Sequence, residues 1–211
     1  MTRIKLCGLK RAEDIEAANG LRPDYVGFVL WKGSRRYVPP EEAERLKKLL
    51  RPGIAAVGVF VDEDPEKAAE LLNSGVIDLA QLHGSEDGSY IRRLRELTDR
   101  PVIRAFRIRR AEDAAKAEES SADYVLADSG AGTGTVFDWS LLAELKRPYF
   151  LAGGLDPDNV GEAVRRLHPW AIDVSSGIET DGVKDREKME SFVRAVRRAS
   201  AAEQGQGGDK R

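Results

Sequence analysis

Apolar and polar positions alternate on two length scales along this chain. Short apolar runs, many of them rich in β-branched residues, are separated by longer segments of Ala, Glu, Lys, Arg and Leu in which apolar residues recur at helical spacing. The short runs predict buried strands and the longer segments predict amphipathic helices, the order typical of βα units and a parallel sheet. The eight predicted strands cover residues 4–7, 25–30, 55–60, 79–82, 102–106, 124–127, 149–152 and 171–174. The eight predicted helices cover residues 12–19, 40–50, 65–73, 89–97, 111–119, 140–145, 157–167 and 186–199.

The number of βα pairs favours a closed barrel. A (β/α)8 barrel needs roughly 200 residues, and this chain has 211. We therefore predict the α/β class and a single TIM barrel of minimal length over residues 1–199. A doubly wound open sheet is disfavoured because no G-x-G-x-x-G motif opens the first helix. Residues 200–211 contain no apolar residue other than alanine, and we expect a disordered tail there.

Composition and charge narrow the class of protein. With 41% hydrophobic and 33% charged residues, the chain is typical of globular proteins. A formal charge of −2 disfavours nucleic acid or an acidic membrane as a partner. The single cysteine, Cys7, and the absence of a Cys/His cluster indicate a reducing, cytoplasmic compartment and no structural metal. The stretch MTRIKLCGLK has no long apolar run, so we expect neither a signal peptide nor a membrane span.

Residues suited to chemistry gather where the predicted strands end. In a (β/α)8 barrel the active site is built at the carboxyl ends of the strands. The residues at or just after these ends include Cys7, Gln81, His83, Asp128, Gly153, Gly154, Ser175, Ser176 and Gly177. We therefore predict the functional site at this end of the barrel.

Two loops predict a phosphate site. LAGGLDPDNV includes the end of the seventh strand, and DVSSGIE includes the end of the eighth. Glycine lets backbone N–H groups approach an anion closely, and these two loops are where such barrels hold phosphate. Either loop alone would more simply be a tight turn, but together they predict a phosphorylated small-molecule substrate. GAGTGTVFDW, after the sixth strand, is weaker evidence because glycine-rich loops are also simply flexible. We expect it to be a mobile loop over the site.

The motifs, taken in order, resemble those of one known family. They are KLCG in the first strand, F-x-x-x-x-x-S-x-R from Phe28 to Arg36, QLHG at 81–84, a strand ending in Asp128, a glycine-rich loop leading into FDW, LAGGL, DVSSGIE and GVKD. The set is similar to that of the phosphoribosylanthranilate isomerases of tryptophan biosynthesis. The resemblance runs from Lys5 to about Phe192, nearly the whole chain.

This resemblance implies an Amadori rearrangement without cofactor or metal. The family converts N-(5′-phosphoribosyl)anthranilate into its 1-deoxyribulose isomer, which needs an acid to protonate the ring oxygen and a base to remove the C2′ proton. The resemblance assigns the base to Cys7 and the acid to Asp128. It places Arg36 against the anthranilate carboxylate, which suits a planar guanidinium group. It also places His83 in the site, where we assign it no proton transfer.

The two catalytic roles need opposite environments. A thiol, with an ordinary pKa of about 8.5, acts as a base only as the thiolate, so we expect the surroundings of Cys7 to favour that form. A carboxyl group, with an ordinary pKa of about 3.9, must hold its proton, so we expect burial or a neighbouring negative charge at Asp128. Without the motifs, Cys7 would more simply be a buried hydrophobe, and Asp128 a helix cap or a loop carboxylate. Arg36 would be a surface residue like Arg35.

Strand alternation adds a prediction that the motifs do not contain. If Cys7 faces the barrel axis, Lys5 faces it too, and on the eighth strand an inward Ser175 implies an inward Asp173. The first and eighth strands are neighbours in a closed barrel, and a buried lysine needs a partner. We therefore predict an interior ion pair between Lys5 and Asp173, beneath the phosphate loop.

Two other functions fit part of the pattern. The isomerase of histidine biosynthesis catalyses the same chemistry on a different aminoaldose. The chains of that family are longer, have a two-fold repeat and use aspartates as acid and base. Cys7 argues against it. A non-catalytic barrel that only binds sugar phosphates would have no reason to hold Cys7, Arg36 and Asp128 together.

The glycine-rich loop departs from the family pattern. Ala131, Thr135 and Val136 stand where the family would have a glycine, a lysine and a threonine. Neither catalytic position is affected, so we expect altered substrate affinity at most. The outer helices leave both a monomer and a homodimer open, because an amphipathic helix has the same pattern facing solvent or a second subunit.

Overall fold

The computed structural model describes residues 1–128, 139–143 and 145–206. The strands are β1 (Arg3–Cys7), β2 (Tyr25–Val29), β3 (Ala55–Phe60), β4 (Leu79–Leu82), β5 (Val102–Arg107), β6 (Tyr124–Asp128), β7 (Tyr149–Ala152), β8 (Ala171–Val174), β9 (Glu179–Thr180) and β10 (Val183–Lys184). The helices are α1 (Ala12–Leu21), α2 (Pro40–Lys48), α3 (Pro65–Asn73), α4 (Gly88–Leu97), α5 (Ala111–Glu118), α6 (Val160–Leu167) and α7 (Arg186–Gln206), with 3-10 turns η1 (Trp139–Leu142) and η2 (Ser176–Ile178).

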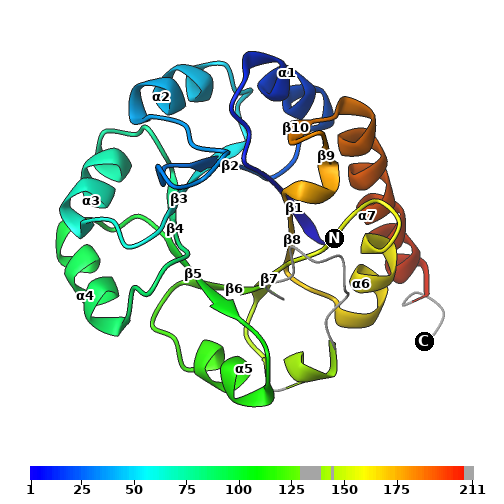
Figure 1. Cartoon of the computed structure of the whole chain (residues 1–211). Coiled ribbons are helices and arrows are strands. Elements are labelled where there is room, and N and C mark those ends of the chain that lie inside the picture. Colours follow the sequence, from blue (N-terminus) through cyan, green and yellow to red (C-terminus); the bar gives the residue numbers. More distant parts are fainter. Residues whose placement is uncertain (129–138, 144, 207–211) are drawn as a thin grey trace.

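Strands β1 to β8 form one closed parallel barrel inside a ring of helices (Figure 1). The barrel closes between β1 and β8, where Lys5 is opposite Asp173. β9 and β10 form a separate antiparallel hairpin between β8 and α7. The predicted fold, a single (β/α)8 barrel, is confirmed.

Aromatic side chains fill the amino-terminal end of the barrel. Tyr124 stacks on Trp170 with ring centroids 4.6 Å apart, and Phe150 meets Trp170 edge to face at 5.2 Å. The guanidinium group of Arg3 lies 4.3 Å from the centroid of the Trp170 ring. The rest of the interior is packed with Val57, Leu79, Ile103, Ala105, Leu126, Ala152 and Ala171. Because this end is filled, chemistry belongs at the carboxyl end.

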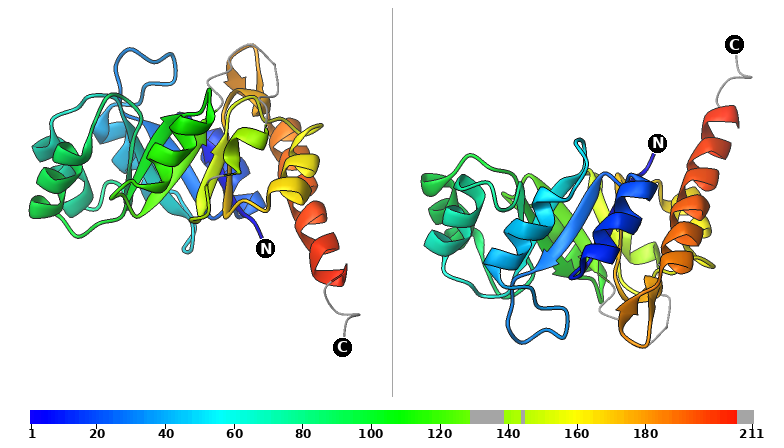
Figure 2. Two further views of the ribbon diagram at one scale, coloured as in Figure 1. Left: turned by 90° about the horizontal axis from the view of Figure 1, so that it is seen from below. Right: turned by 90° about the horizontal axis from the view of Figure 1, so that it is seen from above.

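Loops on the opposite face rise above the carboxyl ends of the strands. Figure 2 shows the loop after β2 and the β9–β10 hairpin projecting on one side of the barrel, away from the N-terminus. α7 runs along the outside, packs against α6 and α1, and extends beyond the barrel. Among the described helices, none is long and apolar enough to cross a membrane.

The strand predictions are confirmed to within one residue at each end, and α1 to α5 to within two. The predicted helix at 140–145 is wrong: η1 is a single 3-10 turn. A six-residue segment forms too few backbone hydrogen bonds to offset helix nucleation. The turn is enough to bury Trp139 and Leu142.

Two helix ends also differ from the prediction. α6 begins at Val160 rather than at 157, because the Asp156 carboxylate accepts the backbone N–H groups of Asp158 and Asn159, 2.9 Å from each, in a turn. α7 continues through Gln206, so residues 200–206 of the expected tail are helical. Residues 207–211 and the glycine-rich loop at 129–138, with its departures at Ala131, Thr135 and Val136, lie outside the described residues.

Candidate active site

A cavity of about 390 Å³ opens at the carboxyl end of the barrel. Strand ends and the loops after them form its wall. Eight of the nine predicted site residues line it: Cys7, Arg36, His83, Asp128, Gly153, Gly154, Ser175 and Ser176. The ninth, Gly177, lies in η2, directly after Ser176. The fold therefore gathers residues from six different segments around one space.

Cys7 ends β1 and opens onto this cavity with 7% of its surface exposed. Gly27 is opposite it on β2, and a Cβ at that glycine would lie 2.6 Å from the sulfur. Burial raises the pKa of the Cys7 thiol, and the charges of Lys5 and Lys184 lower it only in part. The expectation that the surroundings favour the thiolate is therefore wrong as a net effect, because loss of hydration outweighs the two ammonium groups.

The ion pair predicted between Lys5 and Asp173 is confirmed. Nζ of Lys5 lies 3.0 Å from each carboxylate oxygen of Asp173. Lys5 is completely buried, and Asp173 reaches the cavity wall. Burial alone would lower the pKa of Lys5, but its interactions with Asp173 and Cys7 outweigh burial and raise the pKa. Lys5 is therefore a buried ammonium group.

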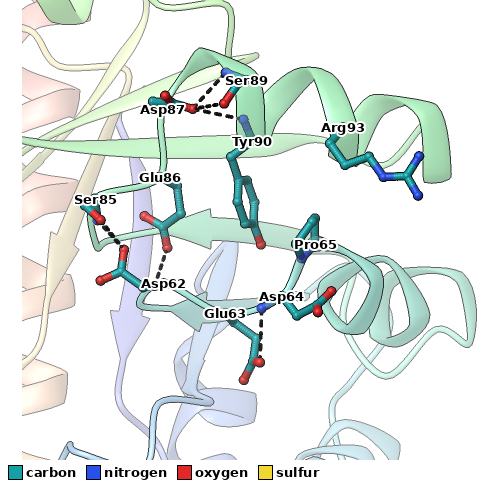
Figure 3. Close-up of a pocket in the computed structure, with 10 residues that line it drawn as sticks. All are labelled: Asp62, Glu63, Asp64, Pro65, Ser85, Glu86, Asp87, Ser89, Tyr90 and Arg93. Atoms are coloured by element: carbon teal, nitrogen blue, oxygen red, sulfur yellow. Dashed lines mark hydrogen bonds between the residues drawn. The ribbon is translucent and has the colours of Figure 1, made fainter.

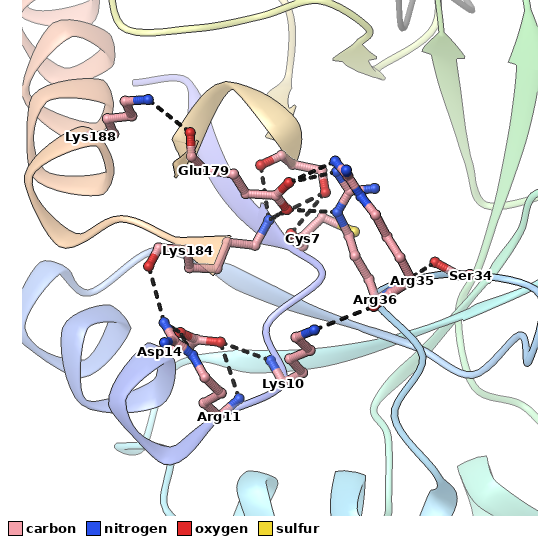
Figure 4. Close-up of polar contacts among 11 residues, drawn as sticks. Cys7, Lys10, Arg11, Asp14, Ser34, Arg35, Arg36, Glu179, Lys184 and Lys188 are labelled. Carbon is pink, nitrogen blue, oxygen red and sulfur yellow. Dashed lines mark hydrogen bonds and ion pairs between the residues drawn. The ribbon is translucent and has the colours of Figure 1, made fainter. Parts of the chain in front are cut away.

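A buried carboxylate holds Arg36 at the side of the cavity (Figure 4). Glu179, in β9, accepts hydrogen bonds from Nε and Nη2 of Arg36 at 2.6 and 2.8 Å. Nζ of Lys184, in β10, donates to the same carboxylate at 2.7 Å and to the backbone oxygen of Ser175 at 2.9 Å. Arg35 also reaches Glu179, but its side chain is 63% exposed. The β9–β10 hairpin thus joins the loop after β2 to the loop after β8.

Glu179 makes folding stability depend on acid pH. Burial alone would raise the pKa of Glu179, but hydrogen bonds and charges from Arg36 and Lys184 outweigh it and lower the pKa from 4.5 to about 2. A lowered folded-state pKa stabilises the fold above the unfolded-state pKa, and this contribution is lost as pH falls from 4.5 to about 2. At pH 7 we expect Glu179→Gln to lower the free energy of unfolding by up to about 3 kcal/mol. Urea denaturation across this pH range should show that the difference in free energy of unfolding between the variant and wild type becomes smaller toward pH 2.

Glu42→Gln is the matched control for that measurement. Glu42 pairs with Arg45 at 2.6 and 2.7 Å, but on the exposed surface of α2, where ion pairs contribute little. This variant should follow wild type at every pH. A difference between Glu179→Gln and wild type that stays constant with pH would contradict the proposed linkage.

His83 connects a buried glutamine to Asp128. Nε2 of Gln81 lies 2.8 Å from Nδ1 of His83, and Nε2 of His83 lies 3.3 Å from Oδ2 of Asp128. In the neutral tautomer with its proton on Nε2, His83 accepts the Gln81 amide N–H at Nδ1 and donates to Asp128. Gln81 is buried in the barrel, with 1% of its surface exposed, so it holds the His83 ring in place from the interior.

Glycines bring the loops after β7 and β8 together. Gly153 and Gly154 have φ angles of 90° and 64°, in the left-handed region that favours glycine. A Cβ at Gly177 would lie 1.9 Å from the backbone oxygen of Leu155, so only glycine allows the two loops to touch. Ser176 lines the cavity beside this contact. Such closely packed, glycine-rich backbone is typical of phosphate sites in barrels of this kind.

A larger cavity, of about 590 Å³, lies between the loops after β3 and β4 (Figure 3). It is rich in carboxylates, but these hold the loops together. Glu86 accepts the backbone N–H groups of Asp62 and Gly84, each at 2.8 Å, and a hydrogen bond from Arg104 at 3.3 Å. Within the described part of the chain, no group of three or more His, Cys, Asp or Glu residues is placed to hold a metal ion.

Sequence reasoning gave no role to four residues that the structure brings into or against the site. Glu179 and Lys184 fix Arg36 and the loop after β8, and Gln81 orients His83. Trp31 lines the cavity with 45% of its surface exposed. Glu179 lies in DVSSGIE and Lys184 in GVKD, so membership of those motifs was the available signal.

Fold and cavity together define a class of protein, the (β/α)8-barrel enzymes with acid–base groups at the carboxyl ends of their strands. Residues 4–195 match the family model described as N-(5'phosphoribosyl)anthranilate (PRA) isomerase. The chain belongs to the N-(5′-phosphoribosyl)anthranilate isomerase family.

Individual relatives are similar over nearly their whole length. The N-(5′-phosphoribosyl)anthranilate isomerase of Endomicrobium trichonymphae is 44% identical over 202 residues, covering 93% of this chain and 99% of the relative. An isomerase structure in complex with reduced 1-(o-carboxyphenylamino)-1-deoxyribulose 5-phosphate has a TM-score of 0.84 and 35% identity, covering 93% and 99% of the two chains. A structure of monomers generated from the dimeric isomerase of Thermotoga maritima has a TM-score of 0.83 and 36% identity, and it covers 93% and 99% of the two chains.

Proposed function

We propose that this chain catalyses the Amadori rearrangement of N-(5′-phosphoribosyl)anthranilate to 1-(2-carboxyphenylamino)-1-deoxyribulose 5-phosphate. One observation carries the proposal: a single cavity is lined by the thiol of Cys7, the carboxyl group of Asp128, Arg36 and the loops after β7 and β8. The substrate has a reacting sugar, a carboxylate and a phosphate. Each of these has a chemically matched group in the wall.

Cys7 and Asp128 divide the proton transfers between them. Asp128 protonates the furanose oxygen as the bond from that oxygen to C1′ breaks, which leaves a Schiff base. The thiolate of Cys7 then removes the proton from C2′, and the electron pair forms an enolamine that tautomerises to the ketose. β1 and β6 are separated by β7 and β8 around the ring, so the two groups approach the substrate from different directions.

The ends of the substrate are assigned to the charged and glycine-rich parts of the wall. The phosphate is placed at Gly153, Gly154 and the Ser175 to Gly177 turn, and the anthranilate carboxylate at Arg36. Glu179 occupies the Nε–Nη2 edge of Arg36, so the edge formed by the two terminal nitrogens is the one available to the substrate. The ligand of the related complex, a carboxyphenylamino sugar phosphate, has the same groups.

Arg36→Lys is expected to raise KM by about 10- to 100-fold with a smaller change in kcat. Hydrogen bonds to charged groups contribute about 1.5–3 kcal/mol, and an ammonium group cannot reproduce the fork. Steady-state kinetics with Arg35→Lys alongside checks this, because Arg35 makes the same Glu179 contact from an exposed position. Equal changes in the two variants would remove Arg36 from the substrate site.

The function itself is tested by turnover of freshly made N-(5′-phosphoribosyl)anthranilate, followed as loss of anthranilate fluorescence. The aminoaldose of histidine biosynthesis is offered in parallel. We expect turnover of the first substrate. Turnover of the second alone would favour the sister isomerase, and no turnover of either would favour a barrel that only binds sugar phosphates.

The assembly and location of the protein stay predictions. The relative from Thermotoga maritima is described as dimeric. For this chain we keep both a monomer and a homodimer, which light scattering after gel filtration separates. A cytoplasmic location and catalysis without a cofactor likewise remain expectations from the sequence.

A further inference from the structure

The buried pair of Lys5 and Asp173 has a third member. An ammonium group has three N–H donors, and Lys5 directs two of them at the two oxygens of Asp173, each 3.0 Å away. Its charge also interacts with Cys7. The cysteine stands two residues further along β1, so both side chains point to the same side of the sheet. Lys5 thus acts on two groups, on the carboxylate of Asp173 through hydrogen bonds and on the thiol through its charge.

Fold stability alone does not account for this pair. Removing two charges from water costs several kcal/mol for each ion, and apolar side chains of similar size often stabilise an interior as well or better. Other interior positions of the barrel, such as Val57 and Ile103, are apolar. Lys5 has no exposed surface, so it reaches a substrate only through another residue.

The charged groups that act on the sulfur come from four different segments of the chain. They are Lys5 on β1, Asp173 on β8, Lys184 on β10 and Arg36 in the loop after β2. Lys184 and Arg36 share the carboxylate of Glu179. Lys5 differs from both, because its partner is Asp173 and its charge lowers the thiol pKa more than that of Lys184 does.

We propose that Lys5 is a positioning residue for the catalytic base: its ammonium group, anchored by Asp173 and buried on the same side of β1 as Cys7, stabilises the thiolate of Cys7 through its positive charge. The thiol loses its proton to solvent, the thiolate takes the C2′ proton, and Lys5 keeps its own proton throughout. Asp173 has a double role, since it holds the ammonium group in place and at the same time adds a negative charge that opposes the thiolate. The catalytic consequence rests on the proposed function, but the charge effect on the thiol does not.

The test is the pH dependence of alkylation of Cys7 by iodoacetamide, an uncharged reagent small enough for the cavity. Cys7 is the single cysteine, so mass spectrometry reports this thiol alone. Lys5→Met should raise the thiol pKa, and the alkylation rate at lower pH should fall with the thiolate fraction, about tenfold if the pKa rises by one. Asp173→Asn should move the pKa in the opposite direction and speed alkylation. An ion pair that only supports the fold would not produce changes of opposite sign.

Two further variants keep the test decisive. Lys47→Met removes a lysine that lies outside the site, where its Nζ pairs with Oδ1 of Asp78 at a distance of 2.6 Å. This variant should leave the thiol pKa unchanged. If Lys5→Met does not fold, Lys5→Gln combined with Asp173→Asn keeps a neutral polar pair. Its thiol pKa should lie above that of wild type, because the lysine acts on the sulfur more strongly than the aspartate does. Circular dichroism confirms that each compared protein is folded.

The outcomes separate this inference from the proposed function. Opposite changes of the thiol pKa in the single variants, or a raised pKa in the double variant, support the role of Lys5 whether or not the isomerase substrate is turned over. In an active enzyme, the rising limb of kcat/KM against pH should move with the thiol pKa. An unchanged thiol pKa in folded Lys5→Met or in the double variant would overturn the inference, even with full wild-type activity.

Discussion

Replacing Cys7 by alanine should lower kcat by about 100- to 10,000-fold, the usual contribution of a positioned general base. Alanine keeps the Cβ that packs against Gly27 and removes only the sulfur, so the barrel and the wall of the cavity should persist. Binding of a product analogue should therefore change little. Turnover of freshly made N-(5′-phosphoribosyl)anthranilate gives the rate, and titration with the analogue gives the affinity.

Cys7→Ser is the matched control, because a hydroxyl group nearly fills the space of the thiol but is a far weaker acid. It should be as inactive as the alanine variant if the sulfur acts as a base. Burial raises the pKa of the wild-type thiol, so kcat/KM should rise with pH up to that raised value. This limb should be missing from the residual activity of both variants. A retained rate in either one would make Cys7 a packing residue.

The barrel could be predicted because its strands carry their signal locally. β7 and β8 are buried at every position, so β7 appears in the sequence as an uninterrupted apolar run and β8 as one interrupted only by Asp173, as expected for a parallel sheet covered on both faces. The β9–β10 hairpin has no such pattern. Its strands have two residues each, and the ion pair between Glu179 and Arg36, 143 positions apart, holds it in place. No local pattern specifies contacts of that kind.

The candidate site could be predicted in outline for a different reason. The rule that barrel sites lie at strand ends selects Cys7 and Asp128, and alternation along β1 and β8 was enough to pair Lys5 with Asp173. The direction in which the pKa of Cys7 moves was beyond this reasoning. It depends on whether burial or the nearby ammonium groups dominate, and that balance is set by three-dimensional packing.

Asp128→Asn should lower kcat about as far as loss of the base, by roughly 100- to 10,000-fold. The amide has nearly the size of the carboxyl group, and its oxygen can still accept the hydrogen bond from Nε2 of His83. It has no acidic proton to give to the furanose oxygen, so ring opening should become rate-limiting. Single-turnover measurement with saturating substrate, together with analogue binding, separates this loss of chemistry from a loss of affinity.

His83→Gln distinguishes the acid from the residue that contacts it. Glutamine keeps an N–H that can donate to Asp128, and a net hydrogen bond contributes about 0.5–1.5 kcal/mol, so its kcat should fall by no more than about tenfold. A fall as deep as that of Asp128→Asn would mean that the proton reaches the substrate through the imidazole. A nearly unchanged rate in Asp128→Asn would instead remove the carboxyl group from the reaction. The relative size of the two effects therefore decides which of the two groups is the acid.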